Sequence, residues 1–244
     1  MESPALAVTG TDSRSLHSEA LSIFRGLAAS YDRVVDGATF FQDRYWKSWA
    51  VRNLGQGGGA LALDIGCGTL LFEERVGCRG WTFVGLDLTE EMLKLGKAKN
   101  LGNVGPLVAG DGERLPFPDE TFGAVVSCYV PKYVDVERMA QEVGRVSKPG
   151  AIAVFYDFAR PRGMFAPLID LYTRGGLRVV GRMLRLGRRK EAATFAALPR
   201  IIHMADWDRR ILGAMGTNGF DTIEARPLTG GAVFGYCGRK RPAA

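Results

Sequence analysis

Five short apolar segments between residues 60 and 157 constrain the fold of this chain more than any other feature. They cover residues 60–65, 81–86, 105–109, 123–127 and 151–157, and turns or stretches with helical spacing separate them. Short apolar runs bounded by Gly, Pro and Asp predict buried strands, and strands that alternate with helices predict a parallel sheet with helices on both faces. Ligands of such sheets bind at the carboxyl ends of the strands, so we expect a site at that edge.

Further elements complete the predicted sheet. Thr89 is expected to cap a helix that runs to Lys99, and helices are also expected over 134–147, stopped by Lys148-Pro149-Gly150, and over 206–216. Two closing strands, 221–225 and 232–237, are expected to be joined through Pro227 and Gly230-Gly231. The predicted fold class is therefore α/β, with a doubly wound, mostly parallel, seven-stranded sheet of the Rossmann-like type.

The chain is predicted to form a single domain over residues 16–240. Residues 1–15 are small and polar and are expected to be a disordered tail, whereas 16–54 carry apolar residues at helical spacing, which predicts lead-in helices. The positions with this spacing are Leu21, Phe24, Leu27, Ala28, Tyr31, Tyr45, Trp46, Trp49 and Leu54. Residues 161–203 are irregular and are expected to form a helical lid or substrate insert before the last strands.

Composition narrows the classes of function. No apolar run approaches the roughly 18 residues of a membrane span, and the N-terminus has no signal pattern, so a cytoplasmic protein is expected. The cysteines are scattered singly and only two histidines are present, so no metal site is expected. The net charge of +6 permits attraction to an anionic partner.

Three successive strand ends carry the residues of a ligand site. The turn Asp64-Ile65-Gly66-Cys67-Gly68-Thr69 lies between a strand and a helix, where glycines let the backbone approach a ligand. Asp87 ends the second strand about 20 residues later, as expected of a carboxylate that holds ribose hydroxyls. Gly110-Asp111-Gly112-Glu113 follows the third strand, at the position for reading an adenine edge. We therefore predict that the three strand ends converge on one pocket.

The order and spacing of these residues resemble the class I S-adenosylmethionine-dependent methyltransferases. A dehydrogenase of the same broad fold would more often show G-x-G-x-x-G, whereas here Thr69 and Leu70 follow the second glycine. Over residues 24–240 the chain also resembles the ubiquinone/menaquinone biosynthesis C-methyltransferase family. The resemblance lies in Phe24–Asp32 with its Ala-x-x-Tyr-Asp ending, in Glu142–Gly150, in Phe155–Pro161 followed by Tyr172, and in the tail from Leu228-Thr229-Gly230-Gly231 to Gly238-Arg239-Lys240.

This resemblance implies S-adenosyl-L-methionine as the cofactor. It assigns cofactor contacts to Thr69, Asp87, Asp111, Gly112 and Cys128, and Tyr31 is expected to close over the cofactor. With the glycine turn included, the predicted cofactor-binding residues are Tyr31, Asp64, Gly66, Cys67, Gly68, Thr69, Asp87, Leu88, Asp111, Gly112 and Cys128. The chain departs from the pattern at Leu70, where many relatives have a small residue.

The resemblance further implies C-methylation of a lipophilic quinol- or phenol-type acceptor. The protein must chiefly align the nucleophile and exclude water, and alignment alone contributes about 7–11 kcal/mol. Attack by a ring carbon needs electron density from an adjacent hydroxyl, which predicts a base or a cation near the fourth and fifth strand ends. The candidates are Lys132, Tyr129, Tyr156 and Asp157, and Lys132 is hypothesised to stabilise a phenolate in place of the family's arginine.

The segment Tyr129–Tyr133 favours a second interpretation. It replaces the family's Phe-Gly-Leu-Arg-Asn and so removes an arginine and an asparagine from the substrate side. O- or N-methylation of another small metabolite is therefore an alternative function.

A run of arginines in the insert suggests a surface partner. Arg174, Arg178, Arg182, Arg185 and Arg189 recur at three- and four-residue spacing, which gathers them on one side of a helix. A basic amphipathic helix indicates peripheral contact with a membrane, worth up to roughly 5 kcal/mol for five arginines. A lid helix with a solvated basic face is the alternative. A nucleic-acid-binding module is a third function, but no stacking aromatics interleave the arginines, so no nucleic acid is expected.

Overall fold

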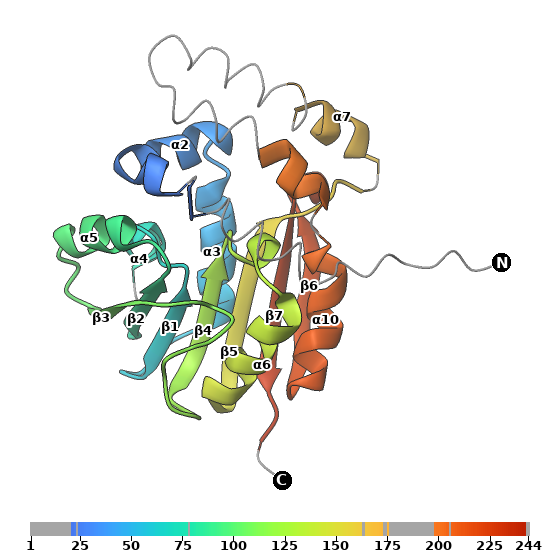
Figure 1. Cartoon of the computed structure of the whole chain (residues 1–244). Coiled ribbons are helices and arrows are strands. Elements are labelled where there is room, and N and C mark those ends of the chain that lie inside the picture. The colour runs from blue at the N-terminus through green and yellow to red at the C-terminus, as the bar shows by residue number, and fades with distance from the viewer. Residues whose placement is uncertain are drawn as a thin grey trace.

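A seven-stranded sheet in the order β3-β2-β1-β4-β5-β7-β6 forms the centre of the protein (Figure 1). The structure is a computed structural model, and it describes residues 21–22, 24–77, 79–162, 164–172, 175, 198–204 and 206–242. The strands are β1 (Leu61–Ile65), β2 (Thr82–Asp87), β3 (Val104–Ala109), β4 (Phe122–Cys128), β5 (Ser147–Phe158), β6 (Phe220–Leu228) and β7 (Val233–Lys240). The first five strands are parallel, and β7 runs antiparallel to both of its neighbours. The predicted mostly parallel, seven-stranded sheet is confirmed.

Helices cover both faces of the sheet. They are α2 (Tyr31–Ala38), α3 (Asp43–Leu54), α4 (Leu71–Val76), α5 (Glu90–Ala98), α6 (Val136–Val146), α7 (Ala166–Leu171) and α10 (Trp207–Thr217), with the 3-10 turns η1 (Ala28–Ser30), η2 (Pro131–Tyr133) and η4 (Thr229–Gly231). Figure 1 shows α6 and α10 on one face and α3 on the other. The structure therefore has a helical layer on each face of the sheet, as a doubly wound fold requires.

Side chains of each strand alternate between the two layers. Ala62 packs with Trp46 and Trp49 of α3, whereas its neighbour Leu63 packs on the opposite face with residues of α6 and α10. This period of two follows from the pleat of a strand, and burial on both faces explains the continuous apolar runs in the sequence.

Several predicted boundaries were wrong. The helix that was expected over 134–147 is α6, which begins after Asp135 and ends at Val146, and Ser147 already belongs to β5. Lys148-Pro149-Gly150 was expected to stop this helix ahead of a strand over 151–157, but it already lies in β5, within an irregularity where Phe122 pairs with Ser147 and Ala124 pairs with Ile152. The pairing can accommodate Pro149 there because the ladder is interrupted at this point.

Two further expectations need correction. Pro227 was expected in the connection between the closing strands, but it lies inside β6, and an edge strand tolerates a residue without an N–H. Tyr45 was expected on the apolar side of a lead-in helix, but its side chain is exposed, unlike that of Trp46. Thr89 does precede α5, yet its side chain makes no capping bond.

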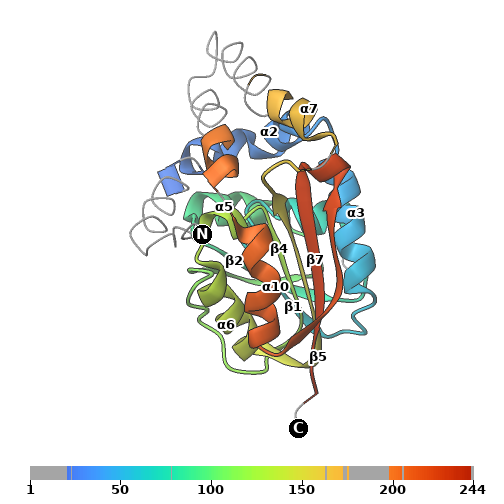
Figure 2. The ribbon, with the colours of Figure 1, turned by 90° about the vertical axis from the view of Figure 1, so that its right-hand side faces the viewer.

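The carboxyl ends of the parallel strands are covered by segments distant in sequence. Figures 1 and 2 both show α2 and α7 at this end of the sheet, on the side opposite to the C-terminus. Of the expected insert over 161–203, the structure describes α7 and a helical segment over 198–204; the arginine run from Arg174 to Arg189 and the tail over 1–15 lie outside the described residues. Within the described ranges no helix is long and apolar enough to span a membrane.

Candidate cofactor site

Asp87 anchors the site at the tip of β2. Its Oδ2 accepts a hydrogen bond from Gly68 N at 2.9 Å, and its Oδ1 accepts one from Thr89 N at 2.7 Å. Burial raises the pKa of Asp87 above its ordinary value, although these two N–H groups act against the rise. Each carboxylate oxygen can accept more than one bond, so Asp87 retains acceptor capacity for two hydroxyls of a ligand.

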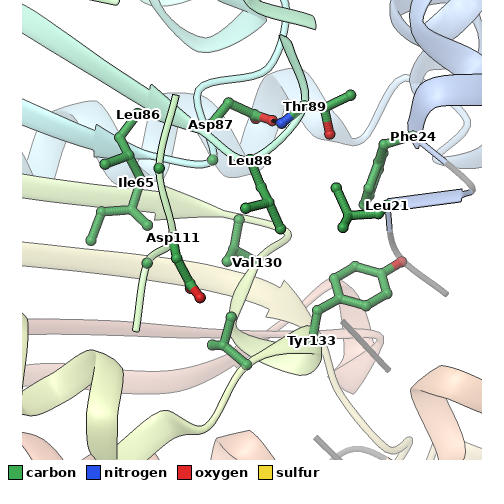
Figure 3. A pocket seen from close by; sticks show the side chains of 14 residues that line it. Leu21, Phe24, Ile65, Leu86, Asp87, Leu88, Thr89, Asp111, Val130 and Tyr133 are labelled. Atoms are coloured by element: carbon green, nitrogen blue, oxygen red, sulfur yellow. Dashed lines mark hydrogen bonds between the residues drawn. The ribbon is translucent and has the colours of Figure 1, made fainter. Parts of the chain in front are cut away.

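A cleft lies beside Asp87 at the ends of β1 to β4. The space within the cleft amounts to about 520 Å³ when the part open to solvent is included. Its lining residues are Leu21, Phe24, Ile65, Gly66, Leu86, Asp87, Leu88, Thr89, Gly110, Asp111, Gly112, Val130, Tyr133 and Val134. Figure 3 shows Ile65 and Leu86 on one side of the cleft and Phe24, Leu21 and Tyr133 on the other.

Two glycines leave room at the floor of the cleft. Gly66 has a φ of 76°, and a Cβ placed there would come within 2.1 Å of the Val130 side chain. A Cβ on Gly112 would come within 2.9 Å of the Ile65 side chain. Because any larger residue would displace a wall of the cleft, these positions fit a ligand that approaches the backbone closely.

Asp111 supplies the second carboxylate of the cleft. Its Oδ1 accepts a hydrogen bond from Glu113 N at 2.8 Å, which holds the turn after β3. An apolar, half-open cleft with carboxylates at two strand ends fits an adenosine moiety, because ribose hydroxyls and an adenine amino group both donate hydrogen bonds.

Thr69 contacts a lead-in helix rather than the cleft. It is buried, and its hydroxyl donates to Asp32 Oδ1 of α2 at 2.5 Å. Lys99 donates to the other oxygen of Asp32 at 2.9 Å and also pairs with Glu74 of α4. The glycine turn is therefore tied to α2 by a chain of hydrogen bonds.

Tyr31 begins α2 and lies above the glycine turn. Its Cε1 is 4.0 Å from the position of a Cβ on Gly68, and its ring meets that of Phe24 edge to face at 6.1 Å. Phe24 in turn lines the cleft, so Tyr31 is placed behind this wall.

Asp64 lies beneath the turn and interacts with another carboxyl group. Asp64 and Glu73 of α4 are both almost fully buried. Burial and the neighbouring Glu73 raise the pKa of Asp64 well above its ordinary value, and burial raises the pKa of Glu73 from 4.5 to about 7. Burial of two neighbouring carboxyl groups therefore favours their protonated, neutral forms, because two negative charges at this depth would repel.

Tyr129 and Tyr156 belong to a buried polar cluster on the α3 side of the sheet. Asp43 Oδ1 accepts from Lys47 Nζ and from Tyr129 OH, both at 2.6 Å, and Asp43 Oδ2 accepts from Arg75 at 2.6 Å. Lys47 Nζ also donates to Tyr156 OH at 3.2 Å. Burial would raise the pKa of Asp43, but Lys47, Tyr129 and Arg75 together lower it below its ordinary value.

Lys132 and Asp157 form a second buried pair. Lys132 Nζ donates to Asp157 Oδ1 and to the Tyr129 carbonyl, both at 2.7 Å, and both side chains are buried. Burial lowers the pKa of Lys132 and raises that of Asp157, with each partner opposing the change in the other. The ammonium lies 4.2 Å from the ring centroid of Tyr133, which lines the cleft.

The structure thus divides the predicted residues into two groups. Gly66, Asp87, Leu88, Asp111 and Gly112 line the cleft. The residues that do not line the cleft are Tyr31, Asp64, Cys67, Gly68, Thr69 and Cys128, together with the four candidates Tyr129, Lys132, Tyr156 and Asp157.

Several cleft residues were not predicted as site residues. Leu21 and Phe24 had been noticed for their helical spacing, and Phe24 also as the start of a stretch that carries the family resemblance, whereas Val130, Tyr133 and Val134 follow β4. The one available signal for the last three was their position after a strand end, which by itself does not distinguish them from Lys132.

Comparison with known proteins identifies the family and the fold. Residues 63–155, which run from β1 to β5, match the methyltransferase domain family. A solved methyltransferase in complex with the Haloferax volcanii Trm112 methyltransferase activator has the same fold, with a TM-score of 0.63, 15% identity, and coverage of 89% of this chain and 97% of that one. The fold and the site define a class I S-adenosylmethionine-dependent methyltransferase.

Closer relatives narrow the class. The ubiquinone/menaquinone biosynthesis C-methyltransferase UbiE of Cronobacter sakazakii is 30% identical over 227 residues, which are 89% of each chain. The demethylmenaquinone methyltransferase of Mycolicibacterium paratuberculosis is 32% identical over 226 residues, covering 91% of this chain and 94% of the relative. The chain belongs to the ubiquinone/menaquinone biosynthesis C-methyltransferase family.

Proposed function

We propose that this methyltransferase methylates a ring carbon of a lipophilic quinol- or phenol-type acceptor in menaquinone or ubiquinone biosynthesis. The observation that carries the proposal is the 30–32% identity to enzymes named for that reaction, which extends over about nine-tenths of both chains. That likeness extends well beyond residues 63–155, which match the common methyltransferase domain.

We assign the cofactor to the cleft beside Asp87. Asp87 would accept the ribose hydroxyls, Asp111 would accept from the adenine amino group, and the small Gly66 and Gly112 would leave room for the ligand. Leu88 and Phe24 supply apolar walls. Tyr31 and the Thr69–Asp32 hydrogen bond would hold the lead-in helix against the glycine turn, so that the site closes around the ligand.

The protein's own contribution to catalysis is alignment and the exclusion of water. When bound, S-adenosylmethionine supplies a methyl group that is already electrophilic. Val130 and Tyr133 after β4 would form the wall between the cofactor cleft and the acceptor, and their apolar surfaces would keep water from the reacting groups. Alignment of this kind contributes about 7–11 kcal/mol, so no covalent intermediate on the protein is required.

The geometry supports a positioning role for the four candidate residues. Lys132 is bonded to Asp157 and to the Tyr129 carbonyl, so its ammonium holds the chain after β4 in place. The Tyr129 hydroxyl donates a hydrogen bond to the Asp43 carboxylate, and Tyr156 is fully buried beside Lys47. We infer that these groups fix Val130 and Tyr133 rather than take a proton from the acceptor.

Calorimetric titration with S-adenosylmethionine is the first test. The wild type is expected to bind, Asp87→Ala is expected to lose binding, and Asp119→Ala is the matched control because this exposed carboxylate lies outside the cleft. Turnover is then measured with a demethylmenaquinol of short side chain. A C-methylated product supports the proposal, and absence of binding by the wild type would refute it.

The same assay tests two subsidiary points. An O-methylated product would favour the alternative of a different small acceptor, for which the altered Tyr129–Tyr133 segment is the supporting observation. Normal turnover by Lys132→Met would exclude both a positioning and a phenolate-stabilising role for Lys132.

We also propose that the arginine run from Arg174 to Arg189 brings the enzyme to an anionic membrane surface, where a lipophilic acceptor resides.

A further inference from the structure

Large apolar side chains gather at one exposed corner of the molecule. We define the apolar corner as Phe40, Phe41, Met164, Phe165, Leu168 and Leu171, whose exposed fractions lie between 52% and 84%. The first two residues follow α2, and the other four belong to α7 and the residues just before it. Single exposed apolar residues are ordinary on protein surfaces, whereas a contiguous group of this kind indicates an interaction site.

The two halves of the apolar corner are in contact. The ring of Phe40 lies 5.1 Å from that of Tyr172, and Tyr172 OH donates to the Ala38 carbonyl at 2.6 Å. Trp46 Nε1 of α3 donates to Thr229 of η4, and a Cβ placed on the adjacent Gly230 would lie 3.4 Å from the Phe165 side chain. Figures 1 and 2 show α2 and α7 together at the carboxyl end of the sheet, the end that holds the cofactor cleft.

The backbone presents the two phenylalanines at a cost. Phe40 and Phe41 have φ values of 47° and 61°, in the left-handed region that residues with a Cβ rarely adopt. Neither ring is buried in compensation. Strained backbone of this kind is concentrated at functional sites, and here it coincides with two consecutive exposed aromatic rings.

The basic residues of the chain favour an anionic partner for the apolar corner. The Arg44 guanidinium lies 6.0 Å from the ring centroid of Phe41. The sequence that follows α7 carries seven basic residues and one acidic residue between positions 173 and 197, and the whole chain has a net charge of +6. A second copy of this chain would bring like charges together, whereas an anionic lipid surface accepts both the cations and the apolar side chains.

We infer that the apolar corner inserts into the surface of an anionic phospholipid bilayer. The inference rests on the proposed membrane contact and deepens it: basic residues attract the enzyme to the surface, and Phe40, Phe41, Leu168 and Leu171 enter the boundary between headgroups and acyl chains. Insertion at this corner turns the carboxyl end of the sheet, and with it the site, toward the bilayer.

Vesicle sedimentation with the full chain tests the inference. Vesicles of phosphatidylcholine with about a third phosphatidylglycerol are expected to bind the protein, and vesicles of phosphatidylcholine alone are expected to bind it weakly. The variants Phe40→Ser/Phe41→Ser and Leu168→Ser/Leu171→Ser are each expected to weaken binding at least tenfold, because each removes two half-exposed apolar side chains. The matched control is Leu212→Ser/Ile223→Ser, two exposed apolar positions on α10 and β6, which is expected to bind as the wild type does.

The possible outcomes distinguish insertion of the apolar corner from electrostatic attraction by the arginines and from cofactor binding. Binding that survives both serine variants but disappears in high salt would overturn insertion and leave the electrostatic contact standing. No binding of the wild type to anionic vesicles would refute the membrane contact itself, whereas S-adenosylmethionine affinity measured without lipid reports on the methyltransferase site separately. Self-association that the Phe40→Ser/Phe41→Ser variant abolishes would instead identify a second copy as the partner. In the Phe41→Trp variant, brominated lipids are expected to quench the fluorescence of the introduced tryptophan. Lack of quenching would count against insertion.

Discussion

Replacing Glu73 with glutamine is expected to stabilise the protein above neutral pH and to leave it unchanged in acid. Glu73 is 3% exposed and interacts with Asp64, and burial raises its pKa from 4.5 to about 7. Between these pH values the folded chain holds a proton that the unfolded chain has released. The contribution of this group to stability is therefore complete below about pH 4.5 and is lost as the pH rises to about 7.

The size of the effect follows from the same difference. The interval from 4.5 to about 7, at about 1.4 kcal/mol per pKa unit, corresponds to about 3 kcal/mol in the free energy of unfolding. Glutamine has nearly the same shape and stays neutral at every pH, so the variant avoids the buried charge. An amide can also hydrogen-bond to the Asp64 carboxyl group, so we expect a gain of about 3 kcal/mol at pH 8.5 and less than about 1 kcal/mol at pH 5.

Urea unfolding at the two pH values measures this directly. The buried tryptophans Trp46, Trp49 and Trp207 provide the fluorescence signal, and the dependence on urea is expected to keep its slope. Glu74→Gln is the matched control, because the neighbouring carboxylate is exposed and bonded to Lys99. An equal gain for Glu73→Gln at both pH values would refute the reasoning, since a packing effect does not depend on protons.

Two further variants test local packing. Leu70→Gly is expected to lower the free energy of unfolding by about 2 kcal/mol, measured by denaturant unfolding. The variant loses a leucine side chain that is only 1% exposed, and this loss outweighs the gain of about 1 kcal/mol from placing glycine at a left-handed φ of 60°. Lys132→Met is expected to cost about 3–5 kcal/mol because Asp157 is left buried without its partner, and adding Asp157→Asn should recover at least half of the loss in a thermal scan; no recovery would contradict the pairing.

The strands could be predicted because each is a local signal. An apolar run that is buried on both faces and ends in Gly or Asp is visible in sequence, and β1, β2 and β4 lie within one residue of their predicted bounds. The extension of β5 back to Ser147 could not be predicted, since Lys148-Pro149-Gly150 has the composition of a turn. Only the register with β4 places it in the sheet.

In the candidate site, too, some residues could be predicted from local sequence and others depend on packing between distant segments. Gly66, Asp87 and Asp111 sit at strand ends, so chain order alone brings them together. Lys132 and Asp157 are 25 residues apart, and their ion pair depends on how β4 and β5 are packed. Asp43 is surrounded in sequence by polar and exposed residues, and nothing local indicates that its carboxylate is buried against Lys47, Arg75 and Tyr129.

The position of β7 sets the order in which the molecule can be completed. β7 is later in the chain than β6, yet it lies between β5 and β6 in the sheet. During synthesis β6 therefore has no neighbouring strand, and one edge of β5 stays open, until residues 233–240 have left the ribosome. An incomplete chain therefore exposes unpaired edges of both β5 and β6, which are templates for aggregation, so nascent chains of this enzyme are expected to depend on chaperones up to the last strand.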